Sequence, residues 1–149
     1  MTPEEKLVIL KQVESVAALA GLRGAIDNTG DHFFMGFDLA AGRTQRIFVR
    51  PTGTAPDGKT VITIFSPARS LTKGMFGGLG RQEAIDILRM NEALFFARFG
   101  IYETPSEVTV VASLDAVLET LDANELRTHA YAVANAADQY EAKFGTNRF

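Results

Sequence analysis

Apolar residues recur at helical spacing in three segments of the chain. These predicted helices run from Pro3 to near Gly21, from Arg81 to Leu94 and from Asp122 to Phe144. Thr2 and Glu5 form a capping box at the first start. Asp122 and Glu125 form another at the last. The last helix carries one narrow apolar stripe, so it needs a surface to lie on.

Five segments alternate between apolar and polar positions, as strands with one buried face do. They are His32 to Leu39, Arg43 to Arg50, Lys59 to Ser66, Phe95 to Tyr102 and Glu107 to Leu114. The element order is therefore α-β-β-β-α-β-β-α, which predicts an α+β fold with helices packed on an antiparallel sheet. No linker or repeat divides the chain, so we expect one domain over residues 1–149.

The composition indicates a soluble globular protein. Of 149 residues, 46% are hydrophobic and 11 are Phe, which is enough for a sizeable core. The net charge is −3, and the nearest approach to a basic run is Arg43, Arg46 and Arg50 along one predicted strand. Nucleic-acid binding is therefore not expected. An acidic N-terminus, the absence of a long apolar run and the lack of cysteine favour a cytoplasmic protein without a signal peptide or membrane span.

No residue pattern points to catalysis, a metal or a cofactor. The glycine-rich stretch from Gly74 to Gly80 precedes a helix, but Arg81 and Gln82 follow it where a phosphate loop has Lys and a hydroxyl residue. His32 and His129 lack the spacing of a metal site. No serine lies in a nucleophile-elbow motif. We therefore expect no enzyme activity and no cofactor.

The strongest functional indication is an excess of apolar residues, mostly aromatic, on the strand face opposite the expected core. The residues on this second face are Phe34, Phe48, Phe96, Tyr102 and Val111. A sheet covered by helices on one side is usually polar on the other, so a second subunit or a bound segment is expected to cover them. The alternative is that the chain's own middle helix or loops cover this face. Met75 and Phe76, in the glycine-rich stretch, are further candidates for docking on a neighbour or partner.

Several segments in the second half of the chain carry a family resemblance. They are Ile87 to Asn91 with Arg98 to Gly100, Leu121 to Leu126, and Ala136 to Glu141. With these segments and this element order, the chain resembles the type III secretion chaperone-like fold and, within it, the YbjN-type family of small bacterial proteins. The resemblance implies a non-enzymatic module, often dimeric, that holds a segment of another protein. It implies no catalytic residue.

The preferred hypothesis is a homodimeric, chaperone-like protein-binding module that acts through apolar surface and binds an unidentified protein segment. Its expected binding or dimer residues are Phe34, Phe48, Met75, Phe76, Phe96 and Tyr102. The alternative is a regulatory domain that senses a small molecule in a pocket between the sheet and the helices. In that case Arg46, Arg50 or Arg98 would anchor an acidic ligand.

Overall fold

The computed structural model describes residues 1–74 and 78–144, which contain three α-helices and six β-strands. The helices are α1 (Pro3–Leu19), α2 (Arg81–Ala93) and α3 (Ala123–Phe144). The strands are β1 (Gly24–Ile26), β2 (Phe33–Asp38), β3 (Thr44–Thr54), β4 (Thr60–Thr72), β5 (Arg98–Glu103) and β6 (Glu107–Val117). None of the described helices is both long and apolar enough to span a membrane.

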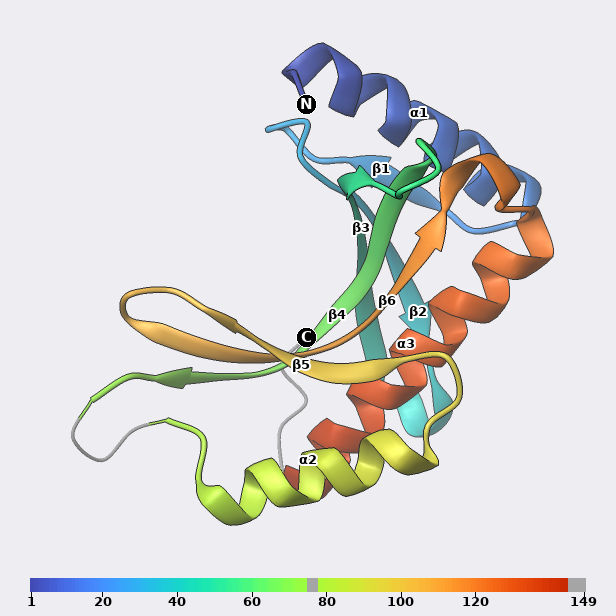
Figure 1. Ribbon diagram of the computed structural model, residues 1–149. Coiled ribbons are helices and arrows are strands. Elements are labelled where there is room, and N and C mark those ends of the chain that lie inside the picture. Colours follow the sequence, from blue (N-terminus) through green and yellow to red (C-terminus); the bar gives the residue numbers. More distant parts are fainter. Residues whose placement is uncertain (75–77, 145–149) are drawn as a thin grey trace.

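The six strands form one antiparallel sheet in the order β1-β2-β3-β4-β6-β5. The helices α1 and α3 lie along one face of this sheet, and α2 lies below β5 in the view of Figure 1. The sheet curves, so its other face is concave and opens to the left of the same view. The predicted α+β fold, with helices packed on an antiparallel sheet, is confirmed.

The structure adds one strand to those predicted and moves several strand ends. β3 runs to Thr54 rather than Arg50, and β6 runs to Val117 rather than Leu114. β1 is not among the five predicted strands, because three residues are too few for alternation to be visible. β5 begins at Arg98 rather than Phe95, because Phe96 has a left-handed φ of 64° where the chain turns after α2. β4 continues past Ser66, because Pro67 lies at a β-bulge, where a residue without an N–H is tolerated.

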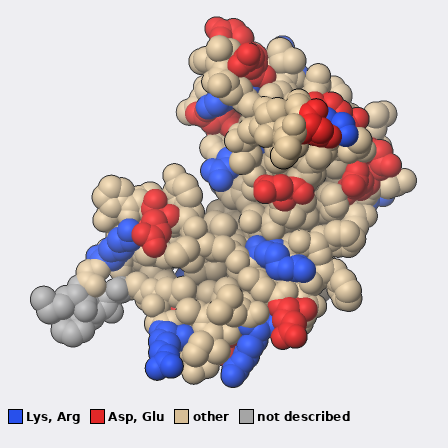
Figure 2. Space-filling model, in the orientation of Figure 1, with Lys and Arg blue, Asp and Glu red and all other residues tan. Residues whose placement is uncertain are grey.

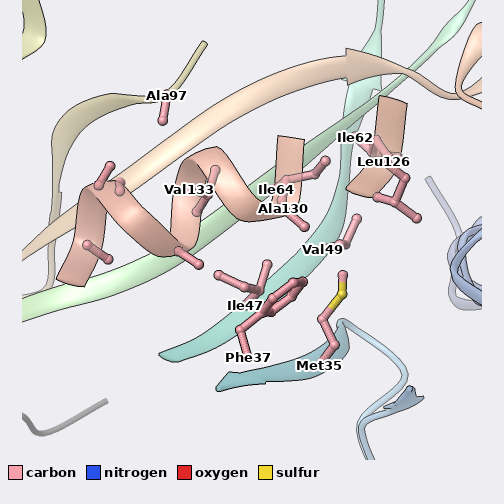
Figure 3. Close-up of a cluster of buried hydrophobic side chains, with 14 of the residues drawn as sticks. Met35, Phe37, Ile47, Val49, Ile62, Ile64, Ala97, Leu126, Ala130 and Val133 are labelled. Carbon is pink, nitrogen blue, oxygen red and sulfur yellow. The ribbon is translucent and has the colours of Figure 1, made fainter. Parts of the chain in front are cut away.

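The core lies between α3 and the covered face of the sheet. Leu126, Ala130 and Val133 project from α3 toward the strands (Figure 3). Ile47 and Ile64 meet them from β3 and β4 and are fully buried. Each buried Val, Leu or Ile side chain contributes about 1.5–3 kcal/mol relative to an exposed one. This layer therefore stabilises the fold independently of the concave face.

α2 buries fewer residues against the rest of the protein than α3 does. Ile87 is the one buried residue among those of α2, all of which are described. Glu83 forms an ion pair with Arg69 of β4, with 2.7 Å between Nη1 and Oε1, and accepts a hydrogen bond from the Tyr140 hydroxyl of α3. Burial and the Glu83 carboxylate raise the pKa of Tyr140, so its hydroxyl stays protonated and keeps donating. Polar contacts to β4 and α3 therefore add to the burial of Ile87 in fixing the position of α2.

Candidate functional site

The concave face of the sheet, which the described helices leave uncovered, carries a row of neighbouring side chains. The strand register pairs Phe34 with Phe48, Phe48 with Phe65, Phe65 with Ser113 and Ser113 with Arg98. Because side chains alternate along a strand, the adjacent residues Ile47 and Ile64 point into the core instead. We call this concave side the open face.

Two stacked phenylalanine rings form the floor of the open face. Phe48 and Phe65 lie with ring centroids 5.4 Å apart and ring planes inclined by 22°. The His32 ring meets both edge-on, with centroids 6.1 Å from Phe48 and 5.9 Å from Phe65. The Arg50 guanidinium lies over Phe65, 5.2 Å from the ring centroid. These contacts hold an aromatic cluster in a defined arrangement at the surface.

An aspartate orients the histidine of this cluster. His32 Nδ1 lies 3.0 Å from Asp27 Oδ2, and the backbone N–H groups of Asp31 and His32 donate to Asp27 Oδ1. Partial burial disfavours the charged carboxylate, but these hydrogen bonds outweigh it and lower the pKa of Asp27 to about 2. Asp27 is therefore ionised at neutral pH, so Nδ1 of His32 is the donor and the ring is held in place.

A hollow of about 300 Å³ opens beside the aromatic cluster. Its walls include Phe65, Pro67, Tyr102, Val111, Thr109 and Ser113. Figure 2 shows the same side of the molecule indented between the upper body and the arm at lower left, with mostly uncharged residues inside the indentation. The hollow lies on the open face, not between the sheet and the helices, where the small-molecule hypothesis placed its pocket. A hollow with apolar walls and a few hydroxyl groups can accommodate side chains of a bound protein segment or a small ligand.

Three of the predicted binding residues lie on the open face. Phe34 and Phe48 are adjacent and half-buried, and Tyr102 is exposed and lines the hollow. Sequence reasoning did not single out Phe65, which stacks on Phe48. The signal was present, because Phe65 follows Ile64 in β4 just as Phe48 follows Ile47 in β3.

The placement of Phe96 with these residues was wrong. Phe96 lies in the turn before β5 rather than in a strand, so it does not follow the alternation of the sheet. Its ring lies 5.5 Å from the His129 ring of α3, on the helix-covered side, and is 61% exposed. The other two candidates, Met75 and Phe76, lie outside the described residues.

The outer edge of β5 is a second exposed feature. β5 ends the strand order of the described sheet, and both the N–H and the C=O of Phe99 are bound by the Asn91 side chain of α2, at 2.6 and 3.1 Å. Asn91 therefore covers the edge at Phe99. By alternation the N–H and C=O of Ile101 point to the same edge, and its side chain is 52% exposed. This end of β5 is open to pairing with another strand.

Two charged groups of the open face have partners within the described chain. Within residues 1–74 and 78–144, no three His, Asp or Glu side chains gather as a metal site would require. On the open face, His32 is paired with Asp27, and Asp115 accepts a hydrogen bond of 2.6 Å from Thr63. The arrangement offers apolar area, hydroxyl groups and arginines to a ligand.

The fold is similar to that of a type III secretion chaperone. The crystal structure of Yersinia pestis SycH in complex with a stable fragment of YscM2 matches with a TM-score of 0.55 and 16% sequence identity. The match covers 89% of this chain and 98% of that chain. The chain therefore has the type III secretion chaperone-like fold. It matches no family model and no curated protein sequence, so the resemblance to the YbjN-type family stays a prediction.

Proposed function

We propose that the protein is a non-enzymatic, chaperone-like module that holds a segment of another protein on its open face. The observation that carries this proposal is the stacked Phe48–Phe65 pair on a concave face that the described helices leave uncovered. Covering apolar surface contributes about 25 cal/mol per Å², so a segment laid over this cluster is stabilised there. SycH, which is crystallised with a fragment of YscM2, supports the proposal as a relative in fold.

We also propose that two copies of the chain associate through the β5 edge. Ile101 on this edge and Leu88 on the neighbouring α2 are 52% and 69% exposed, so apolar surface adjoins the open end of the strand. A two-fold axis would pair one β5 with its copy, since a symmetric dimer uses the same patch on both chains. The dimer would then leave both open faces accessible to protein segments.

Three finer parts of the proposal rest on the sequence. The protein catalyses no reaction, because its His and Ser residues lack catalytic motifs. It acts in the cytoplasm, consistent with a chain that contains no cysteine. It belongs to the YbjN-type family, on the motifs between residues 85 and 141.

The open-face proposal is tested by photo-cross-linking in extract of the native host with a reactive group at Phe34. We expect partner proteins to be cross-linked by the parent chain and lost with Phe48→Asp, because a charge in the aromatic floor disfavours apolar contact. The variant should stay folded, since Phe48 is half-buried and outside the helix-covered core. Leu19→Asp, at an exposed leucine on α1, is the matched control and should retain the cross-links. Equal cross-linking by Phe48→Asp would contradict the proposal.

The alternative is a domain that senses a small molecule in the hollow. One observation favours it: the Arg50 guanidinium lies over Phe65 at the wall of a cavity of about 300 Å³. A small aromatic acid would fit this combination of ring and cation. A thermal-shift screen of metabolites distinguishes the two functions, since a ligand that binds only the folded state raises the melting temperature. Stabilisation that is lost with Arg50→Gln would favour the small-molecule function.

A further inference from the structure

The outward residues of β3 form a short pattern of charge and apolar surface. Arg46, Phe48 and Arg50 alternate along the strand with the buried residues Gln45, Ile47 and Val49. Because side chains two residues apart share one face of a strand, the three outward groups stand in line on the open face. At about 3.3 Å per residue, the two arginines are roughly 13 Å apart with the aromatic ring between them.

These arginines have no carboxylate partner within the described residues. The ion pairs there include Lys6 with Asp31 and His32 with Asp27, but neither Arg46 nor Arg50. Two aspartates share the open face by strand alternation. Asp38 and Asp115 lie on β2 and β6, and neither is within 4.0 Å of these two arginines. In a chain of net charge −3, two cations beside a half-buried aromatic floor are therefore left for a partner.

Covering the aromatic floor would change the surroundings of these arginines. A segment that lies over Phe48 removes water from the guanidinium groups on both sides of it. Such desolvation is costly for a charged group unless a counter-charge arrives with the segment. A purely apolar segment would incur this cost, whereas a segment that brings carboxylates would avoid it and fix its own register.

We infer that the open face selects an extended protein segment of acidic-x-apolar-x-acidic pattern. This inference rests on the proposed function and names the chemistry of its partner. In an extended segment, residues i, i+2 and i+4 face the same way and span the same length as Arg46, Phe48 and Arg50. The carboxylates pair with the two arginines, and the apolar side chain packs on the Phe48–Phe65 stack.

The test uses two synthetic peptides with blocked ends, so that terminal charges play no part. Their cores read Glu-Thr-Leu-Thr-Glu and Gln-Thr-Leu-Thr-Gln and are otherwise embedded in the same sequence. Binding to the full chain is measured by fluorescence anisotropy. We expect the Glu peptide to bind roughly tenfold more tightly, the combined effect of two part-exposed ion pairs.

Variants of the protein assign the effect to the arginines. In Arg46→Gln/Arg50→Gln, the preference for the Glu peptide should vanish. In Lys11→Gln, which removes one exposed cation of α1 on the covered side, the preference should remain. In Phe48→Asp, both peptides should bind more weakly, because the apolar contact is lost.

The outcomes separate the inference from the proposed function. Equal binding of the two peptides, still weakened by Phe48→Asp, overturns the acidic preference and leaves the open face as a binding surface. Failure of both peptides to bind also overturns the inference, and the cross-linking experiment with native partners then decides the proposed function by itself. A preference that persists without the two arginines overturns their role in selection.

Discussion

At the scale of single residues, local contacts determine which charges of the open face remain for a partner. Asp27 accepts hydrogen bonds from two backbone N–H groups and from His32, so the imidazole is held and does not compete for ligands. Arg50 instead lies over Phe65 without a carboxylate partner in the described chain. The loop before β2 therefore holds the His32 ring against the aromatic cluster, whereas β3 presents the charged guanidinium of Arg50.

The Asp27 carboxylate should make the free energy of unfolding fall as the pH is lowered. Its pKa is about 2 in the folded chain against an ordinary value of 3.8, so its contribution is complete above the ordinary value and is lost as the pH falls toward about 2. We expect Asp27→Asn to lose less unfolding free energy than the parent between about pH 6 and about pH 2.5. Urea unfolding at both pH values measures this difference. Parallel losses in the two proteins would show that the carboxylate is not stabilised in the folded state.

At the scale of secondary structure elements, the two edges of the sheet are completed in different ways. Close backbone packing adds β1 at one edge, and polar contacts help to attach α2 beside β5 at the other. β1 pairs with β2 so closely that a Cβ atom at Gly24 would lie against the Phe34 carbonyl oxygen and 2.5 Å from a ring atom of Phe33. α2 is attached through polar contacts of Glu83 and Asn91 and through the buried Ile87. A local sequence pattern predicts neither the contact of β1 with β2 nor that of α2 with β5.

Gly24→Ala should therefore loosen β1. We expect it to lower the free energy of unfolding by about 1–3 kcal/mol, the usual cost of inserting a methyl group where there is no space. Gly36→Ala is the matched control, because a Cβ there meets nothing within 4 Å, and its effect should stay within about 0.5 kcal/mol. Chemical denaturation compares the two variants. Equal effects would mean that Gly24 is not packed against β2.

At the scale of the whole molecule, the described chain presents two separate exposed surfaces. The open face is concave and aromatic, whereas the β5 edge is a line of backbone groups flanked by exposed apolar side chains. Asn91 binds the edge at Phe99, so pairing with another strand is restricted to the end near Ile101. The proposed dimer and the proposed segment binding would therefore use different surfaces of the molecule.

Ile101→Lys should separate the proposed dimer. A lysine on an edge strand opposes edge-to-edge pairing, since two like charges would meet across the two-fold axis. Light scattering should give the parent twice the chain mass of 16.2 kDa and the variant the single mass. Leu19→Lys, at an exposed leucine of α1, should remain dimeric. A parent protein of single-chain mass, or a variant of unchanged mass, would contradict the β5 dimer.

Apart from the short strand β1, the element order and the helix starts follow from short-range patterns. Thr2 and Glu5 form the capping box that their spacing indicated, and Asp122 accepts a hydrogen bond of 2.8 Å from the Glu125 N–H at the start of α3. Caps and helical stripes involve residues three or four positions apart, so they can be recognised in the chain itself. The same is true of the alternation that separates Ile47 from Phe48.

The sequence by itself therefore determined the α+β class, the helix starts and the two faces of most strands. Only the tertiary structure decided that Phe48 stacks on Phe65, that Phe96 leaves the open face and that Pro67 continues β4 through a bulge. The physical reason is the separation along the chain between the residues that interact. Helix caps and strand alternation depend on near neighbours, whereas a binding surface forms where the strand register brings distant residues side by side.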